Sequence, residues 1–294
     1  MSPSGAMSVE EFDVVVVGGG MSGVSAAYHL RTLMPHLSVV VLERRPRVGG
    51  TWDLFRYPGI RSDSDMHTFG FSFSPWTGNR NIAPGPEILE YLNRTVDTFD
   101  LRRHIRFGES VERASFSSAH ARWDLRGTRA GEAAGTQYRC KFLFLCSGYY
   151  QYEQGFTPSF PGRETFEAKG GRVVHPQQWD PAKDDAFYKG KRVVIIGSGA
   201  TAVTMLPVMA ARGAASVTML QRTPGYVVGL PGSGDWVKSL LSPVSLSLAA
   251  RAARMKNIIA QVFYYNVATY FPGAARKGIM VRLVVWRGGG EMGR

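Results

Sequence analysis

The sequence FDVVVVGGGMSGVSAAYHL, residues 12–30, decides the fold of this chain. Its four consecutive valines are typical of a strand that is buried on both faces of a parallel sheet. Three glycines follow at the spacing G-x-G-x-x-G: Gly18, Gly20 and Gly23. An alanine-rich segment that continues to about Met34 is expected to be a helix, and the apolar segment Ser38–Leu42 predicts the next strand. This order of elements predicts a βαβ unit.

An acidic residue ends this unit at the position where dinucleotide-binding folds use one. Glu43 closes the second predicted strand, 20 residues after Gly23. Its carboxylate can accept hydrogen bonds from the ribose hydroxyls of an adenosine, and it repels a 2′-phosphate. A pyrophosphate would lie at the N-terminus of the helix, where free N–H groups and the helix dipole favour anions. A glycine turn alone is common in α/β proteins, but with Glu43 it predicts a site for FAD or NAD.

A second unit of the same order begins about 180 residues later, with the predicted strands Arg192–Ile196 and Ser216–Leu220 on either side of a helix. Its turn and first helical residues are Gly197, Ser198, Gly199, Ala200, Thr201, Ala202 and Val203. Gln221 and Arg222 follow the second strand, so arginine takes the place that Glu43 has in the first unit. A guanidinium pairs well with a 2′-phosphate, which favours NADPH, although a surface charge at a strand end is the plainer alternative. The two sites together imply FAD and NADPH, with hydride transfer between them.

The sequence therefore predicts an α/β protein with two Rossmann-like dinucleotide-binding domains. Between the two units, Pro84–Phe99 has the pattern of a helix, and Arg113–Arg126 and Tyr138–Cys146 have the pattern of strands. Beyond Pro231 the pattern is helical through Phe271. We expect a FAD-binding domain in residues 1–150, a linker rich in proline, glycine and aromatic residues in 151–190, and a partial NADP-binding domain with a helical segment and an atypical tail in 191–294.

The composition is that of an ordinary globular protein, with 44% hydrophobic and 20% charged residues. Cys140 and Cys146 are the two cysteines, so no disulfide framework is expected. Their spacing does not fit a redox-active pair beside a flavin, which argues against a disulfide reductase. Oxygen or an external acceptor is then the destination of the electrons. No metal site is expected.

The formal net charge is +12, and the stretch from Arg251 onward contains eight basic residues and one acid, Glu291. No nucleic-acid-binding module accompanies these charges, so we expect no nucleic acid partner. One explanation of these basic residues is a solvated helix face followed by a disordered end. The other is peripheral contact of Lys256–Phe271 with anionic lipid, because this segment mixes aromatic and basic residues. The N-terminal residues lack a signal-peptide pattern, so the expected location is cytoplasmic, with membrane association left open.

One further run of residues resembles a signature of the Baeyer–Villiger monooxygenases, a family of flavin-dependent enzymes. It reads G-G-T-W at 49–52, Y-P-G at 57–59 and an aspartate at Asp63. The expected linker carries the glycine, histidine and tryptophan of a second family fingerprint: Gly171, His175 and Trp179. Lys169 stands where that fingerprint has phenylalanine. The resemblance extends over roughly residues 11–281.

The resemblance implies an enzyme that uses NADPH, FAD and O2 to insert one oxygen atom into a ketone, or to add it to the sulfur or nitrogen of a sulfide or thioamide, through a flavin peroxide. The residues it implies to contact FAD are Ser22, Glu43, Thr51, Trp52, Asp53, Leu54, Asp63 and Val111. Those it implies to contact NADP are Arg61, Ser62, Asp63, Gln221, Arg222 and the turn 197–203.

Asp63 is the catalytic residue that the resemblance implies, acting on the charge of an arginine that steadies the peroxide. By sequence context alone, without the family signature, a solvated turn residue is the favoured interpretation of Asp63, and a core aromatic residue that of Trp52. His175 and Trp179 are expected to be hinge residues, because they fall in a linker that must move with the nicotinamide.

The resemblance ends before the family's own sequence does. Members of the family are longer, and the arginine near the flavin belongs to a segment beyond the second nucleotide unit. The residues Leu283–Arg294 do not resemble the family. We therefore expect a C-terminally truncated member with incomplete dinucleotide-binding domains. The alternatives to a working monooxygenase are an inactive remnant that at most binds nucleotides, and an NADPH–flavin oxidase that turns over no organic substrate.

Overall fold

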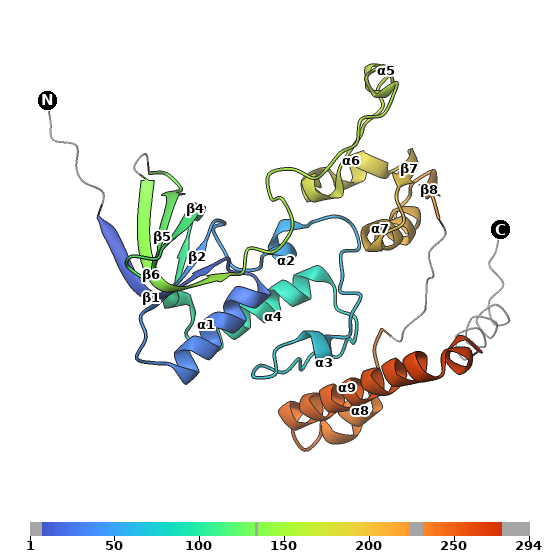
Figure 1. Cartoon of the computed structure of the whole chain (residues 1–294). Coiled ribbons are helices and arrows are strands. Elements are labelled where there is room, and N and C mark those ends of the chain that lie inside the picture. The colour runs from blue at the N-terminus through green and yellow to red at the C-terminus, as the bar shows by residue number, and fades with distance from the viewer. Residues whose placement is uncertain (1–7, 133–134, 224–231, 278–294) are drawn as a thin grey trace, which may run out of the picture. The chain divides into compact units, whose positions relative to one another are not determined.

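The computed structural model describes residues 8–132, 135–223 and 232–277 (Figure 1). By packing, the chain forms two compact units: unit 1 comprises Met1–Ile60 and Pro84–Leu220, and unit 2 comprises Arg61–Ala83 and Gln221–Arg294. The expected atypical tail, Leu283–Arg294, lies outside the described residues. The functional domain boundaries expected near residues 150 and 190 stay a prediction.

Unit 1 contains a six-stranded sheet in the order β3-β2-β1-β6-β5-β4. β1 pairs in parallel with β2 and β6, and β2 pairs in parallel with β3, whereas β5 is antiparallel to both β6 and β4. The strands are β1 Val9–Val17, β2 Val39–Glu43, β3 Ile105–Phe107, β4 Glu109–Ser117, β5 Arg122–Arg129 and β6 Gly135–Leu145. The predicted α/β class, with a parallel-rich sheet, is confirmed.

The valine run of β1 lies at the centre of this sheet because it has a parallel partner on each side. Val14–Val17 stand in register with Val39–Leu42 of β2. The helices α1, Met21–Leu33, and α4, Gly85–Thr98, lie side by side in the same unit (Figure 1). The apolar residues that α1 buries recur at helical spacing: Val24, Ala27 and Leu30. The helix that the sequence predicts at Pro84–Phe99 is thus confirmed as α4.

The segment Arg113–Arg126, which has the pattern of strands, lies in two antiparallel strands, β4 and β5, joined by a hairpin turn. Phe116 pairs with Trp123 across this hairpin, and residues 118–121 form its turn. No glycine, proline, asparagine or aspartate marks the turn in the sequence. Ala121 instead adopts a positive φ of 48°, a backbone conformation that residues other than glycine rarely adopt. The residue pattern therefore does not reveal the hairpin.

A second sheet of unit 1 consists of two parallel strands, β7 and β8, joined by α7. The bounds are β7 Arg192–Ile196, α7 Ala200–Ala211 and β8 Ser216–Leu220, so both strands have the predicted ends. Met205 of α7 packs on this sheet beside Trp179. In the described residues the opposite face is open, since Val194, Ile196 and Leu220 are 62%, 60% and 58% exposed. The expectation of burial on both faces thus holds for β1 and β2 but not for β7 and β8.

Short helices make up much of the remaining chain of unit 1. They are α2 Thr51–Leu54, α5 Arg163–Ala168, α6 Asp184–Tyr188 and the 3₁₀ helices Arg102–His104, Pro176–Gln178 and Pro181–Lys183. Most of these lie in the expected linker, where proline and glycine interrupt longer elements.

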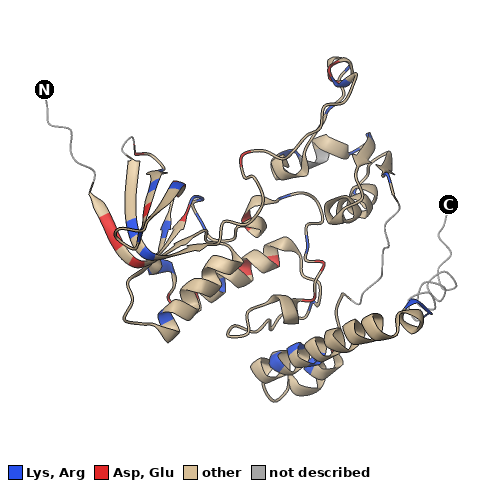
Figure 2. Ribbon diagram, viewed as in Figure 1, with Lys and Arg blue, Asp and Glu red and all other residues tan. Residues whose placement is uncertain are grey.

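Unit 2 contains α3 Met66–Phe69, α8 Trp236–Leu241 and α9 Leu246–Tyr270. The helices α8 and α9 confirm the helical pattern predicted beyond Pro231. Figure 2 shows the basic residues of α9 gathered in its N-terminal half. Within the part of the chain that the structure describes, no helix, the 25-residue α9 included, has an apolar stretch able to cross a membrane.

Candidate functional site: two glycine turns at the ends of parallel strands

The first glycine turn is fixed at the carboxyl ends of three adjacent strands. The Gly18 N–H donates to the carbonyl of Leu42 at 2.8 Å, and the Cys146 N–H donates to the carbonyl of Val17 at 2.7 Å. A Cβ at Gly18 would lie 2.4 Å from the Cys146 carbonyl oxygen, and a Cβ at Gly23 would lie 1.8 Å from the Gly18 carbonyl oxygen. No larger residue fits either position without a shift of the backbone. The turn therefore holds the N-terminus of α1 close to the strand ends, as a pyrophosphate site requires.

Glu43, at the end of β2, directs its carboxylate at this turn. The side chain is buried, and it accepts hydrogen bonds from the Gly19 N–H at 2.5 Å and the Arg45 N–H at 2.8 Å. A carboxylate held beside the glycine turn is the group that recognises adenosine ribose hydroxyls in dinucleotide-binding folds. The residues of this turn fit the adenosine and pyrophosphate of a dinucleotide whose adenosine ribose carries no 2′-phosphate.

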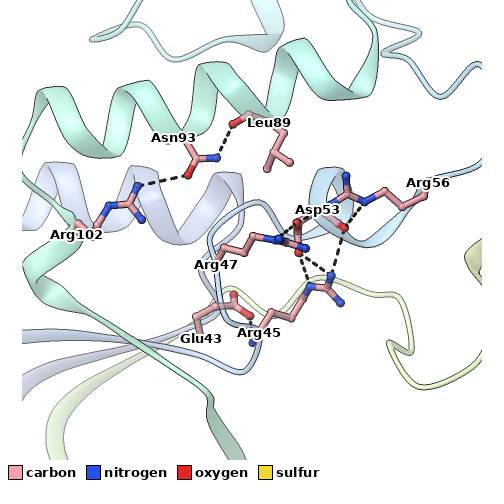
Figure 3. Close-up of polar contacts among 8 residues, drawn as sticks. All are labelled: Glu43, Arg45, Arg47, Asp53, Arg56, Leu89, Asn93 and Arg102. Carbon is pink, nitrogen blue, oxygen red and sulfur yellow. Dashed lines mark hydrogen bonds and ion pairs between the residues drawn. The ribbon is translucent and has the colours of Figure 1, made fainter. Parts of the chain in front are cut away.

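A second buried carboxylate, Asp53 of α2, gathers three arginines beside the first site (Figure 3). Its Oδ2 accepts from Arg45 Nε and Nη2 at 2.8 and 2.6 Å, and its Oδ1 accepts from Arg47 Nε at 2.7 Å and Arg56 Nη2 at 2.9 Å. One negative charge therefore faces three positive charges. The surplus of positive charge lies on the segment that follows Glu43, where it favours an anionic ligand.

α2 is joined to the glycine turn through the backbone. The Gly49 N–H donates to the Gly19 carbonyl at 3.1 Å, and a Cβ at Gly50 would lie 3.1 Å from the Cα of Gly20. Thr51, Trp52, Asp53 and Leu54 form α2 and begin directly after Gly50. The structure thus brings these four residues together with Gly18, Gly20, Ser22, Gly23 and Glu43.

The second glycine turn repeats the arrangement on β7 and β8. The Gly197 N–H donates to the Leu220 carbonyl at 2.8 Å, and Gly197 has a φ of 120°, which favours glycine. Gly199 is the N-cap of α7, so Ala200–Val203 form its first turn. Gln221 and Arg222 follow β8 directly and are exposed. Gln221 and Arg222 are assigned to unit 2, whereas the turn itself belongs to unit 1 and fits a second phosphate site at a helix N-terminus.

The remaining predicted residues lie elsewhere. Val111 is half-buried on β4 and packs against the core cluster that contains Leu42. Arg61, Ser62 and Asp63 belong to unit 2. There the Ser62 hydroxyl donates to the Ser64 carbonyl at 2.7 Å, and Arg61 Nε lies 3.9 Å from Asp63 Oδ1. That contact is a loose ion pair between half-exposed side chains, and the roles expected of these three residues stay predictions.

Two of the three fingerprint residues of the linker, His175 and Trp179, make contacts within it. His175 Nδ1 accepts a hydrogen bond from the Gln177 N–H at 3.2 Å, and Trp179 is buried against Phe187, with ring centroids 4.9 Å apart. Trp179 is therefore part of the core on which α7 rests. Its expected role as a hinge stays a prediction.

Both cysteines are free thiols. Burial raises the pKa of Cys140 to about 11, and burial also raises the pKa of Cys146. Neither thiol is thereby activated as a thiolate at neutral pH. This supports the interpretation of both cysteines as structural residues.

Several residues that surround the first site are not predicted by any motif in the sequence. They are Arg44, Arg45, Arg47, Arg56 and Tyr152. The cluster of basic residues directly after Glu43 could have predicted three of them, Arg44, Arg45 and Arg47. No local pattern links Tyr152 to Glu43, because the two are 109 residues apart in the sequence.

Comparisons with known proteins agree with this geometry. The family described as "Flavin-binding monooxygenase-like" matches residues 12–262. The chain is 47% identical over 268 residues to the FAD-containing monooxygenase EthA of Mycobacterium tuberculosis, which covers 91% of this chain and 53% of that protein.

Two solved structures are also similar. A steroid monooxygenase bound to NADP has a TM-score of 0.66 and 33% identity, with 79% of this chain and 42% of that chain covered. A cyclohexanone-bound cyclohexanone monooxygenase has a TM-score of 0.67 and 30% identity, with 80% and 44% covered. The chain spans about half the length of the curated relative it matches.

Proposed function

Because this chain belongs to the flavin-binding monooxygenase-like family, we propose that it binds FAD at the first glycine turn and NADPH at the second, and that it uses O2 to oxygenate a small organic substrate. The substrate would be a ketone, converted to an ester, or a sulfide, thioamide or amine oxidised on sulfur or nitrogen. The contact of Glu43 with the Gly19 N–H carries the proposal, since it places a carboxylate where adenosine ribose is recognised.

When bound, FAD and NADPH supply hydride transfer and the activation of O2. The chain's own residues bind and orient. The N–H groups at the start of α1 would hold the pyrophosphate, and Glu43 would exchange its backbone donor Gly19 for ribose hydroxyls. The arginines around Asp53 favour an anion beside the turn. Asp63 as the catalytic residue remains part of this proposal, in which its carboxylate would bias the charge of a guanidinium beside the flavin.

The visible absorbance spectrum of the purified, desalted chain is the first test. Oxidised-flavin bands in a one-to-one ratio with the chain support the FAD site, and a protein that stays colourless after FAD is added overturns it. Glu43→Ala should lose the flavin bands, whereas Glu112→Ala, at an exposed position of β4, should keep them. Consumption of NADPH that rises when a ketone is added supports monooxygenation. Consumption that yields only hydrogen peroxide indicates the oxidase alternative instead.

The proposal that the chain uses NADPH depends on Arg222. This residue follows the second strand of its βαβ unit, β8, near the position that Glu43 has at the end of β2 in the first unit. Arg222→Ala should raise the KM for NADPH about tenfold or more, because a charge-assisted hydrogen bond to a 2′-phosphate is worth about 1.5–3 kcal/mol. NADH lacks that phosphate and is the internal control, so its KM should not change. Equal effects on the two nucleotides would remove Arg222 from the specificity site.

We also propose peripheral contact of α9 with an anionic membrane. Phe263, Tyr264 and Tyr265 are 62%, 57% and 70% exposed, and Arg276 and Lys277 follow the helix as exposed cations. Aromatic side chains with flanking cations suit the interface of an anionic bilayer. Sedimentation with phosphatidylglycerol vesicles, but not with phosphatidylcholine vesicles, is the expected result. Absence of the chain from both pellets at low salt would contradict it.

A further inference from the structure

The chain that leaves β6 returns to the end of β2 and is held there by Arg44. Arg44 follows Glu43 directly, and its guanidinium carbon lies 5.2 Å from the centroid of the Tyr152 ring. The same guanidinium forms an ion pair with Glu153. A cation over an aromatic face and an ion pair together tie two segments that are more than a hundred residues apart in sequence.

The hydroxyl of Tyr152 lies at the first glycine turn. A Cβ at Gly50 would stand 3.6 Å from the Tyr152 hydroxyl oxygen and 3.1 Å from the Cα of Gly20. Tyr152, Gly50 and Gly20 are therefore immediate neighbours. Burial and the nearby charge of Glu43 raise the pKa of Tyr152, so its hydroxyl remains a donor at neutral pH.

We propose that Tyr152, held by Arg44 and Glu153, is a clip over the first site: its hydroxyl donates to the ribose or pyrophosphate oxygens of FAD, and its ring slows the release of the cofactor. This inference rests on the proposed FAD site. It adds a binding residue from the linker, a segment to which the glycine turn, α2 and Glu43 do not belong.

The clip is able to open. The side chains of Arg44 and Glu153 are 41% and 61% exposed, and an exposed ion pair contributes at most about 1 kcal/mol and weakens as salt is added. FAD can therefore enter when the Arg44–Glu153 pair separates. Closure over the bound cofactor then adds the hydroxyl contact and covers the site.

The test is the rate of FAD release from the flavin-loaded full chain, followed by the rise in flavin fluorescence after dilution. Tyr152→Ala should release FAD about tenfold faster, the change that corresponds to about 1.4 kcal/mol. Tyr152→Phe keeps the ring and should show a smaller increase. Phe156→Ala removes an aromatic side chain that is 86% exposed in the same segment, and its release rate should equal that of the wild type.

The variant Glu153→Gln tests whether the Arg44–Glu153 ion pair retains FAD or only stabilises the fold. It should release FAD faster than the wild type at low salt and at the wild-type rate at high salt, while the melting temperature without FAD stays unchanged. Release from Tyr152→Ala that is as slow as or slower than from the wild type overturns the clip, because it means that Tyr152 does not hold FAD or occupies its space. A wild-type chain that binds no FAD contradicts the proposed function itself, and is thus distinguishable from failure of the clip.

Discussion

Glu43 and Asp53 are both buried carboxylates of unit 1, but their partners differ. Glu43 accepts from two backbone N–H groups, which are neutral donors, so ribose hydroxyls can replace one of them at small cost. Asp53 accepts from three guanidinium groups, which fix its charge and its position. At the scale of the residue, Glu43 is therefore suited to ligand recognition, and Asp53 to holding the arginines in place.

Replacing Asp53 with asparagine should destabilise unit 1. The three guanidinium groups lose their shared counter-charge, and we expect the free energy of unfolding to fall by about 1–3 kcal/mol, the usual worth of hydrogen bonds to a charged group. Asp97→Asn is the matched control, because Asp97 is 58% exposed and forms an ion pair with Arg102. Urea denaturation of both variants measures the difference, and equal losses would contradict a special role for Asp53.

At the scale of the element, the contact between α1 and β1 depends on glycine. Gly23 lies in the first turn of α1, where alanine would ordinarily favour a helix. A Cβ there would meet the Gly18 carbonyl oxygen at 1.8 Å, far inside van der Waals contact. The approach of helix to strand therefore outweighs helix propensity at this position.

Gly23→Ala should consequently lower the melting temperature, although the same change in an open helix raises stability by about 0.5–1 kcal/mol. The variant should also lose FAD, because α1 must move away from the turn. Ser22→Ala, one position earlier on the same helix, should change the melting temperature of the cofactor-free chain little. A Gly23→Ala chain that is more stable than the wild type would show that the helix can shift without strain.

At the scale of the whole molecule, the two units are stabilised differently. Unit 1 has the apolar core of its sheets, whereas unit 2 combines buried apolar residues, among them Met66, Trp76 and Ala249, with polar contacts of α8 and α9. Arg254 Nη1 donates to the carbonyls of His67, Thr68 and Gly70 at 2.9, 3.1 and 2.6 Å. Lys238 Nζ donates to the Thr77 carbonyl at 2.9 Å, and Lys256 pairs with the buried Asp235.

Acid should weaken unit 2 through His67 and Asp235. Burial and the positive charge of Lys238 lower the pKa of His67 below its ordinary value of 6.5, against the opposite effect of Asp235, Asp65 and Asn81. Folding therefore favours the neutral imidazole, and protonation below about pH 6.5 favours the unfolded chain. Burial would raise the pKa of Asp235, but its hydrogen bonds with Lys256 and Lys238 lower the pKa overall. The ionised carboxylate therefore stabilises the fold above the ordinary pKa of aspartate, and this stabilisation is lost as the pH falls further.

His67→Gln isolates the first effect. The wild type should lose melting temperature between pH 7.5 and pH 5.5, and the variant should lose less over the same range. His104, whose pKa burial and Arg31 also lower, remains in both chains and gives the shared background. Identical pH profiles would show that the pKa of His67 is the same in the folded and the unfolded chain, so that its titration does not affect stability.

Local pattern alone determined the two βαβ units, the glycine turns and Glu43 at the end of β2. It could do so because hydrophobic periodicity and glycine spacing act over a few residues, and the strands β7 and β8 have the predicted ends. The signature at 49–52 and 57–59 likewise predicted the family from the sequence.

Only the tertiary structure decided which distant residues meet. The β4–β5 hairpin turns at Ala121 without glycine, proline, asparagine or aspartate, and the open face of β7 and β8 follows from what packs on them rather than from their composition. Arg56 joins Arg45 and Arg47 on Asp53, and Tyr152 reaches the turn at Gly50. The contact of Tyr152 with Gly50 closes a long loop, and the gathering of arginines on Asp53 depends on charge in three dimensions, and no local pattern of residues encodes either.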